Sequence, residues 1–412
     1  MKFILWFLYS TGVRLGSLYI YFGSFFSNKL ALLYQGRKDT WQKLKAFSSD
    51  NKESIWVHCA SLGEFEQGRP LIERIRKDFP HIPLVLSFFS PSGYEIRKNY
   101  EFADLIIYLP ADLDVCNQRL IEMIKPSMVI FVKYEFWWNL IRILLSNHIK
   151  VFLISGVFRK NDYFFNPILK SFKDLLCRYT KIYVQDDASA TVLLSNGISN
   201  FEVAGDTRID NVIFRSKFSN LPDNIIKFVE NKKVIIYGSI WTSDMKVVCP
   251  LIGKYDDFVH IIAPHDVSDD NIAAIKKMLN QKSSTYSDDH WNSNILIINN
   301  IGMLSGLYSI AKYAYIGGGF QKGIHNTLEP AVFGIPVFFG PKYAKFTEAT
   351  RMIEIEIAYS VQGPEACIRW IDILESDVTE YVRIRDKSNH FFTSNSGATE
   401  KIIADLYPYL RR

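Results

Sequence analysis

Short apolar runs recur along the chain, and each is rich in β-branched or aromatic residues and too short for a helix. In the first half they are Ile55–Ala60, Ile82–Phe88, Leu105–Leu109, Met128–Val132, Val151–Ser155, Lys181–Val184 and Phe201–Ala204. Between them lie charged stretches with helical spacing, such as Pro70–Lys77, whose apolar side chains share one face. Strand alternating with helix predicts a parallel sheet wrapped by helices.

After a polar stretch from Ser216 to Asn231, the same rhythm restarts. The second set of runs is Val234–Tyr237, Val259–Ala263, Ile295–Ile298, Ala314–Ile316, Pro336–Phe339 and Ala358–Val361. The pattern therefore predicts two doubly wound α/β domains, over residues 31–215 and 216–385, and a closing helix over 386–412. Because such sheets bind ligands at the carboxyl ends of their strands, we expect a cleft between the two halves.

The N-terminal segment from Phe3 to Phe26 is nearly all apolar or aromatic but contains Arg14. Its length suits a membrane span, although an Arg at the bilayer centre costs about 2.5–3.5 kcal/mol. We expect a membrane anchor over residues 1–30, either spanning the bilayer or lying in its interface. The alternatives are a buried amphipathic helix and a signal peptide, for which Lys2 gives a charged start but no clear cleavage site follows.

Composition narrows the function classes. The chain has 412 residues and 48% hydrophobic residues, which is ordinary globular usage. Its net charge of +5 includes no Lys/Arg run longer than two, so we expect no nucleic-acid partner, whereas an anionic membrane surface or a phosphorylated substrate would fit. The five cysteines are scattered and odd in number, which indicates a reducing compartment rather than a disulfide framework or a zinc site.

An acid follows two of the predicted strands closely. After the first strand, Glu64 opens the next helix, where a carboxylate either favours the helix dipole or acts as a general base at the mouth of the cleft. After the fourth strand, Glu135 stands beside two tryptophans, which either line a sugar or lipid site or pack in the core. The residues alone leave both questions open.

A glycine-rich segment follows a strand of the second half. Gly317–Gly319 would let the backbone approach a ligand closely, and the segment from His325 is expected to start a helix whose free N–H groups hold a phosphate. Glu329 would lie one turn into that helix, where its carboxylate can accept from ribose hydroxyls. This segment is therefore the predicted ligand site of the second half.

Other motifs are discounted or absent. Asp112 and Asp114 match the D-x-D pattern of metal-dependent glycosyltransferases, but two acids so placed commonly cap a helix, and we expect no metal there. The chain has no GxxxxGK[ST] phosphate loop and no GxSxG elbow, which argues against P-loop ATPases and α/β-hydrolases.

The remaining motifs follow one another as in the Kdo (3-deoxy-D-manno-octulosonic acid) transferase family of lipopolysaccharide biosynthesis, which the chain resembles along nearly its whole length. The family's W-x-H-x-x-S-x-G-E matches Trp56 to Glu64, and its Y-L-P-x-D matches Tyr108 to Asp112. Three further segments are similar to family motifs. Lys133–Asn139 is similar to E-x-E-x-W-P-N, Gly205–Asp210 to G-N-x-K-F-D, and Lys322–Ala331 to G-G-x-H-N-x-L-E-P-A.

The resemblance implies a two-Rossmann (GT-B type) glycosyltransferase that is inverting, metal-independent and without a cofactor. The donor would be CMP-Kdo, and the acceptor a lipid A precursor (lipid IVA) at the cytoplasmic face of the inner membrane. Glu64 would be the general base, with Glu135 and Arg208 as the other catalytic residues. The residues implied for CMP binding are Pro264, His265, Ile301, Gly302, Met303, Asn326, Thr327, Leu328 and Glu329.

Several positions depart from the family pattern. Arg208 replaces a Lys, and Lys133 replaces the first Glu of E-x-E-x-W, which leaves Glu135 as the remaining acid. The family's P-R-H is Pro264-His265 without the Arg, so one phosphate contact is weaker or comes from elsewhere. Its M-G-E is Ile301-Gly302-Met303, so any side-chain role of that Glu is lost. These changes indicate a divergent branch.

Two other functions fit the same residues. A related two-Rossmann transferase or epimerase that uses a UDP-sugar would use the glycine-rich segment and Glu329 equally well, and protection against heat by UDP rather than CMP would favour it. A membrane-tethered, non-catalytic nucleotide- or lipid-binding protein would explain the lost Arg, but the retention of Glu64 and Glu135 argues against it. The number of Kdo residues transferred and the acylation of the acceptor stay open, because mono- and bifunctional members share these motifs.

Overall fold

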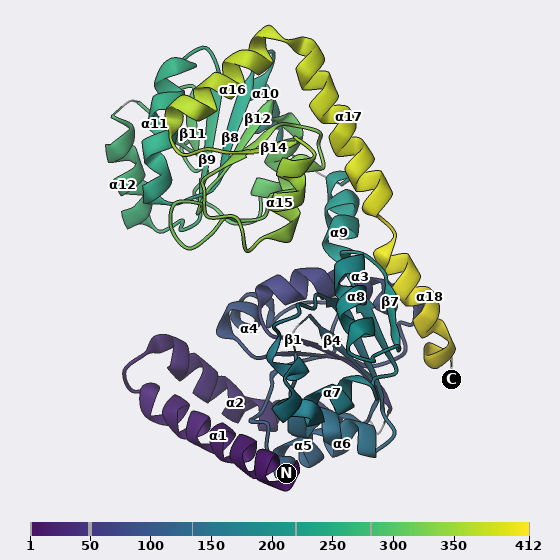
Figure 1. Cartoon of the computed structure of the whole chain (residues 1–412). Helices are drawn as coiled ribbons and strands as arrows, with labels where there is room; N and C mark the ends of the chain where they lie inside the picture. The colour runs from purple at the N-terminus through teal and green to yellow at the C-terminus, as the bar shows by residue number, and fades with distance from the viewer. Residues whose placement is uncertain (1, 48–51, 134, 219–220, 281, 412) are drawn as a thin grey trace. The chain divides into compact units, whose positions relative to one another are not determined.

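The computed structural model describes residues 2–47, 52–133, 135–218, 221–280 and 282–411. The chain divides into two compact units, of which unit 1 is Met1–Asn211 with Ser396–Arg412 and unit 2 is Val212–Asn395. It leaves unit 1 within α9 (Thr207–Ser216) and returns after α17 (Val378–Asn395) to form α18 (Ala398–Leu410). In place of the one closing helix expected over 386–412, the chain has two helices, α17 in unit 2 and α18 in unit 1 (Figure 1).

Unit 1 contains a seven-stranded parallel sheet in the order β3-β2-β1-β4-β5-β6-β7. Its strands are β1 (Ser54–Cys59), β2 (Leu84–Phe88), β3 (Leu105–Tyr108), β4 (Pro126–Val132), β5 (Lys150–Gly156), β6 (Lys181–Val184) and β7 (Phe201–Val203). Each strand expected in this half is present. The direction of the strand order changes between β1 and β4, and doubly wound sheets bind ligands at such a switch point.

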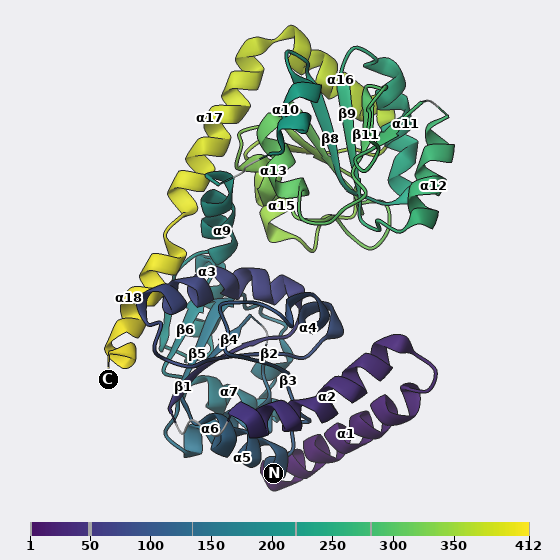
Figure 2. The same ribbon diagram turned by 180° about the vertical axis from the view of Figure 1, so that it is seen from behind.

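Both faces of this sheet are buried, as parallel sheets require. Ile55 and Val57 of β1 pack with α3 (Leu62–Asp78) and α18, whereas Trp56 between them packs on the opposite face. The helices of unit 1 that follow α3 are α4 (Pro91–Arg97), α5 (Asp114–Ile124), α6 (Trp138–Ser146), α7 (Lys170–Leu176) and α8 (Asp187–Ser195). The C-terminal helix thus completes one side of unit 1 (Figure 2).

The first two helices form a hairpin at the edge of unit 1. α1 (Lys2–Gly23) and α2 (Asn28–Phe47) lie side by side and are joined by residues 24–27 (Figures 1 and 2). Leu5, Trp6 and Tyr9 of α1 pack against the core of unit 1. Among the described residues, no helix combines the length and the apolar character that crossing a bilayer requires. The anchor over residues 1–30 stays a prediction.

Unit 2 contains a second seven-stranded parallel sheet, in the order β10-β11-β9-β8-β12-β13-β14. Its strands are β8 (Val234–Ile240), β9 (Val259–Pro264), β10 (Ser284–Thr285), β11 (Ile295–Ile297), β12 (Tyr313–Ile316), β13 (Val337–Phe339) and β14 (Ala358–Ser360). Its helices before α17 are α10 (Asp223–Val229), α11 (Met245–Lys254), α12 (Asp269–Leu279), α13 (Leu304–Leu307), α14 (Leu328–Ala331), α15 (Thr347–Glu354) and α16 (Pro364–Ser376). Only β10 was not expected, because two polar residues give no apolar run. The two doubly wound sheets confirm the predicted fold class.

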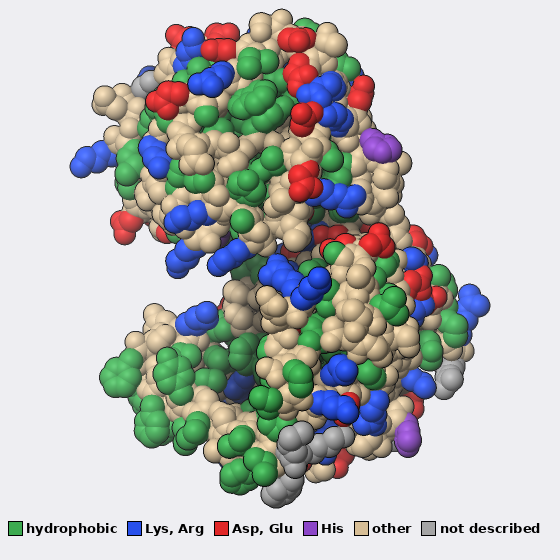
Figure 3. Space-filling model, in the orientation of Figure 1, with side chains coloured by type: hydrophobic (Ala, Val, Ile, Leu, Met, Phe, Trp, Pro, Cys, Tyr) green, Lys and Arg blue, Asp and Glu red, His purple; other side chains and the backbone are tan. Residues whose placement is uncertain are grey.

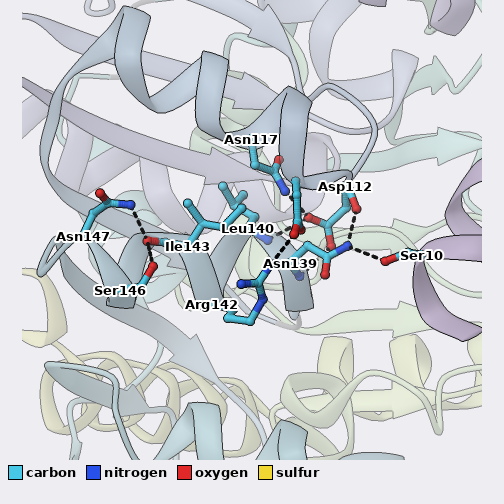
Figure 4. Close-up of polar contacts among 10 residues, drawn as sticks. Ser10, Asp112, Asn117, Asn139, Leu140, Arg142, Ile143, Ser146 and Asn147 are labelled. Carbon is cyan, nitrogen blue, oxygen red and sulfur yellow. Dashed lines mark hydrogen bonds and ion pairs between the residues drawn. The ribbon is translucent and has the colours of Figure 1, made fainter. Parts of the chain in front are cut away.

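Asp112 ties the N-terminal helix to the body of unit 1, and Figure 4 shows its contacts with Asn117 and Asn139. Its buried carboxylate accepts from the hydroxyl of Tyr9 at 2.6 Å and from the backbone N–H groups of Asn139 and Leu140 at 3.1 and 2.8 Å. Burial raises the pKa of Asp112, and these hydrogen bonds oppose that shift. The helix capping expected for this acid is therefore confirmed, although the helix it caps is α6 rather than the next one along the chain.

Replacement of Asp112 by Ala should destabilise unit 1 more than replacement of Asp114. Asp112→Ala removes a cap and takes away the acceptor of the partly buried Tyr9 hydroxyl, which together cost about 2–4 kcal/mol. The Asp114 side chain is 34% exposed and pairs with Arg142 at 2.6 Å, and a pair this exposed contributes about 0–1 kcal/mol. Urea unfolding of both variants measures the difference. Equal losses would contradict this role of Asp112.

Candidate active site

A chain of hydrogen bonds crosses the carboxyl ends of the central strands of unit 1. His58 of β1 lies in register with Ser87 of β2, and both side chains are buried. The Ser87 hydroxyl lies 2.8 Å from Nε1 of Trp56 and 2.8 Å from Nδ1 of His58. His58 Nε2 lies 3.0 Å from Oε2 of Glu135, which follows β4. The chain therefore joins three neighbouring strands at the switch point.

The donors in this chain fix the tautomer of His58. The indole N–H of Trp56 can only donate, so Ser87 accepts from it. The buried Ser87 hydroxyl then donates to Nδ1 of His58, because a buried donor without a partner costs about 1–3 kcal/mol. The ring proton of His58 is thus on Nε2, where it is donated to Glu135.

Glu135 is held by a second donor from its own loop. The indole Nε1 of Trp137 lies 2.5 Å from Oε2 of Glu135 and 3.1 Å from Nε2 of His58, so its proton goes to the carboxylate. The Glu135 side chain is only 11% exposed. It also lines an apolar pocket of about 650 Å³ together with Phe136 and Trp138. Tyr134, which precedes this acid in the motif, lies outside the described residues.

Glu64 lies in the first turn of α3 and is half-buried. The hydroxyl of Ser61 donates to its carboxylate, so the side chain is held at the helix start. Burial raises the pKa of the Cys59 thiol at the end of β1, and the charges of Glu64 and Glu135 add to that shift. The structure thus brings the two predicted carboxylates to the surroundings of one strand end.

Arg208, the third predicted catalytic residue, lies at the start of α9. Its Nη2 and Nε atoms lie 2.6 and 3.0 Å from Oδ2 of Asp206. The preceding Thr207 is buried and donates to the backbone oxygen of Gln67 in α3 at 2.5 Å, which fixes the start of α9 against that helix. The guanidinium charge is therefore offset in part by Asp206 within the protein.

The switch point of unit 2 is organised by Asp244, a residue that the sequence analysis did not single out. Its buried carboxylate accepts from the N–H of Trp241 after β8 and from the N–H of Gly318 after β12, both at 2.9 Å. Burial raises the pKa of Asp244, and the two N–H groups oppose that shift. One carboxylate thus links the two central loops of this sheet.

Three rings from three strand ends stack beside Asp244. His265, which follows β9, lies with its ring centre 4.5 Å from that of Trp241 and 4.5 Å from that of His325. Trp241 Nε1 donates to Nε2 of His325 at 3.0 Å, so the ring proton of His325 is on Nδ1. Burial, together with the neighbouring His265, lowers the pKa of His325 to about 4. This stack presents a neutral imidazole with one N–H donor.

The three glycines after β12 lie where other segments of the protein pack closely against their backbone. A Cβ at Gly317 would lie 2.3 Å from the Ser239 oxygen, and one at Gly319 would lie 2.6 Å from the Gly340 backbone. Gly318 has a φ of +89°, which favours glycine. Close packing of the protein backbone is by itself sufficient to require Gly317 and Gly319, and the expected close approach of a ligand stays a prediction.

The helix expected from His325 begins later and is short. α14 spans only Leu328–Ala331, and the side chain of Asn326 already accepts from the Leu328 N–H at 3.1 Å. Asn326 also donates to Glu329 at 3.1 Å. A single turn gives a weak dipole, so the helix start adds little to anion binding, and the phosphate site expected here stays a prediction. The buried hydroxyl of Thr327 has no hydrogen-bond partner among the described residues.

The other residues expected for CMP binding lie on separate loops of unit 2. Pro264 ends β9 and is followed by the exposed His265. Ile301 is exposed, Gly302 has a φ of +104°, and Met303 precedes α13. In the described ranges, no group of three or more His, Cys, Asp or Glu side chains is arranged to hold a metal ion.

Sequence reasoning located Glu64 and Glu135 but missed Ser87, Asp244 and Trp241. Ser87 had a signal, because a serine inside the apolar run of β2 indicates a buried partner. Asp244 had none, because an acid before a helix is commonly a cap. Trp241 likewise follows an ordinary strand, and only the folded chain shows that it stacks on two histidines.

Comparison with known proteins confirms the resemblance inferred from the sequence. Residues 37–211 match the family model described as 3-deoxy-D-manno-octulosonic-acid transferase (kdotransferase). The 3-deoxy-D-manno-octulosonic acid transferase of Haemophilus influenzae is 24% identical over 384 residues, 87% of this chain and 88% of that protein. That of Aquifex aeolicus is 26% identical over 350 residues, covering 82% and 90%.

A solved structure shows the same two-unit fold. The UDP-GlcNAc 2-epimerase from Neisseria meningitidis, bound to UDP-GlcNAc, has a TM-score of 0.60 and 16% identity, covering 86% of this chain and 100% of that one. At this identity the likeness concerns the fold alone. It agrees with two parallel α/β units of the GT-B type.

The pKa of His325 predicts a pH-dependent stability of unit 2. In the unfolded chain its pKa is about 6.5, so the unfolded state binds a proton first as the pH falls. Unit 2 should therefore lose stability as the pH falls from 6.5 through about 4. His325→Gln keeps an acceptor for Trp241 and does not titrate, so its melting temperature should fall less over this range. Identical pH profiles of the two proteins would contradict the buried neutral state of His325.

Proposed function

We propose that this chain, which is related to the Kdo transferases over most of its length, transfers Kdo from CMP-Kdo to a lipid A precursor such as lipid IVA. The observation that carries the proposal is the carboxylate of Glu135, held by two N–H donors at the switch point of unit 1 and lining an apolar pocket. A fixed carboxylate beside an apolar surface suits chemistry on the hydroxyl of a lipid.

Glu64 is the proposed general base. It would take the proton from the primary hydroxyl of the acceptor as that oxygen forms a bond to the anomeric carbon of Kdo. The bond from that carbon to the phosphate of CMP breaks in the same step, and CMP leaves. One displacement inverts the configuration at the anomeric carbon. Glu135, whose position is fixed more firmly than that of Glu64, would orient the acceptor and is the alternative base.

The charge on the leaving phosphate would be offset without a metal or a cofactor. Arg208 would contribute a guanidinium, part of whose charge Asp206 already offsets. On unit 2 the proposed donors are the Nδ1–H of His325 and the unpartnered hydroxyl of Thr327. Because the Arg of the family's P-R-H is absent between Pro264 and His265, one cationic contact to the phosphate would be weaker or come from elsewhere.

The acceptor would be presented from the cytoplasmic face of the inner membrane. Apolar side chains gather on the surface of the α1–α2 hairpin (Figure 3). Phe22 of α1 is 60% exposed, and Phe25 and Phe26 in the following turn are 68% and 91% exposed. Exposed Lys29 and Lys38 follow on α2. Such aromatic and basic side chains favour the interface of an anionic bilayer.

The direct test is Kdo transfer to lipid IVA with CMP-Kdo generated in the assay. The wild type should form product, and Glu64→Gln should be slower by about 10² or more, because Gln keeps the size and removes the base. Glu135→Gln should also lose activity, since the loss of the charge weakens the contacts with His58 and Trp137. Glu66→Gln, on the same helix, is the matched control and should keep wild-type activity.

Two outcomes would change the assignment. Full activity of Glu64→Gln with an inactive Glu135→Gln would move the base to Glu135. No product from the wild type, with or without EDTA and added metal, would contradict the donor and acceptor, and a UDP-sugar would then be tested as the donor.

A further inference from the structure

The apolar pocket of unit 1 lies between the first helix and the loops that follow β4 and β5. Its volume of about 650 Å³ is in the range of small-molecule sites. Leu8 of α1 and Tyr163 of the β5–α7 connection form an open rim, since they are 59% and 53% exposed. Trp138, which is 5% exposed, and Phe136 line the pocket below the rim.

The residues that line the pocket indicate which class of ligand it suits. Glu135 is the one charged residue of the lining, and His58 and Trp137 hold its carboxylate. The hydroxyl of Tyr9, another lining residue, is already bonded to Asp112. Nearly all of the remaining lining is aliphatic or aromatic carbon. The pocket therefore suits a hydrocarbon chain whose polar end comes near a carboxylate, rather than a sugar or a peptide.

We propose that this pocket receives one acyl chain of the lipid acceptor, and this inference rests on the proposed function. Helix α1, which forms one wall of the pocket, also carries the exposed side chains of Ile4, Phe7 and Phe22. An acyl chain drawn from a bilayer beside α1 can pass over apolar side chains to the rim at Leu8. Its head group then lies at Glu135, so chain binding also positions the hydroxyl that reacts.

This site makes transfer sensitive to acyl-chain length. Each methylene that enters the pocket should strengthen acceptor binding by up to about fourfold, until the pocket is filled. A deacylated, water-soluble acceptor should react without any contribution from the pocket.

The test uses the full chain with Leu8→Trp or Leu169→Trp, each of which puts a larger side chain at a position that lines the pocket. The matched control is Leu15→Trp, because Leu15 is 61% exposed on the same helix and does not line the pocket. With lipid IVA, KM of the two pocket variants should rise about tenfold or more, while Leu15→Trp stays at the wild-type value. With the deacylated acceptor, all four proteins should transfer at the same rate. Equal KM values of Leu8→Trp and Leu15→Trp for lipid IVA, or equal losses with both acceptors, would overturn the proposal.

A second measurement does not depend on catalysis. A photoreactive fatty acid that carries a diazirine should label peptides containing Phe136–Trp138 or Leu5–Tyr9 in the wild type and in Leu15→Trp, but label them weakly in Leu8→Trp. Labelling that avoids these peptides, or that is the same in all three proteins, would overturn the acyl site. If the label maps to the pocket but no acceptor reacts, the acyl site stands and the proposed reaction fails.

Discussion

Burial of the Glu135 carboxylate at the centre of a parallel sheet is the constraint on which unit 1 depends. A buried charge without donors would be strongly unfavourable, so the fold must supply N–H groups at that point. His58 and Trp137 supply them, and Ser87 and Trp56 fix the proton of His58 on the correct nitrogen. Because these residues come from β1, β2 and the loop after β4, the carboxylate keeps its position only while the register of the three strands is intact.

Unit 2 also has a buried carboxylate at its switch point, but its role is different. There the buried carboxylate of Asp244 accepts hydrogen bonds from two backbone N–H groups and so holds the loops after β8 and β12 in place. Beside it lie two uncharged polar groups, the imidazole of His325 and the hydroxyl of Thr327. Unit 1 thus offers acids beside apolar side chains, and unit 2 offers neutral donors. This division matches a reaction in which a base acts on a lipid hydroxyl and a phosphate leaves.

The strands could be predicted because apolar periodicity determines them directly, and only β10, with two polar residues, escaped. Glu64 and Glu135 could be located because acids at strand ends are visible in the sequence. The hydrogen-bond network around Glu135 could not be predicted, because the bonds from His58 to Ser87 and to Glu135 join residues that are 29 and 77 positions apart. The glycines after β12 do not distinguish two causes, because crowding by the Gly340 backbone and close approach of a ligand would each require glycine.

The measurement that tests this account most directly compares His58→Gln with His58→Asn in the transfer assay. The longer Gln amide can still donate to Glu135, whereas Asn can accept from Ser87 but cannot reach the carboxylate. If the network orients Glu135, His58→Gln keeps most of the wild-type kcat. His58→Asn then loses about 10²-fold in kcat, with KM and thermal stability similar in the two variants. Equal kcat values for the two variants would contradict the account, because the donor to Glu135 would then have no part in the reaction.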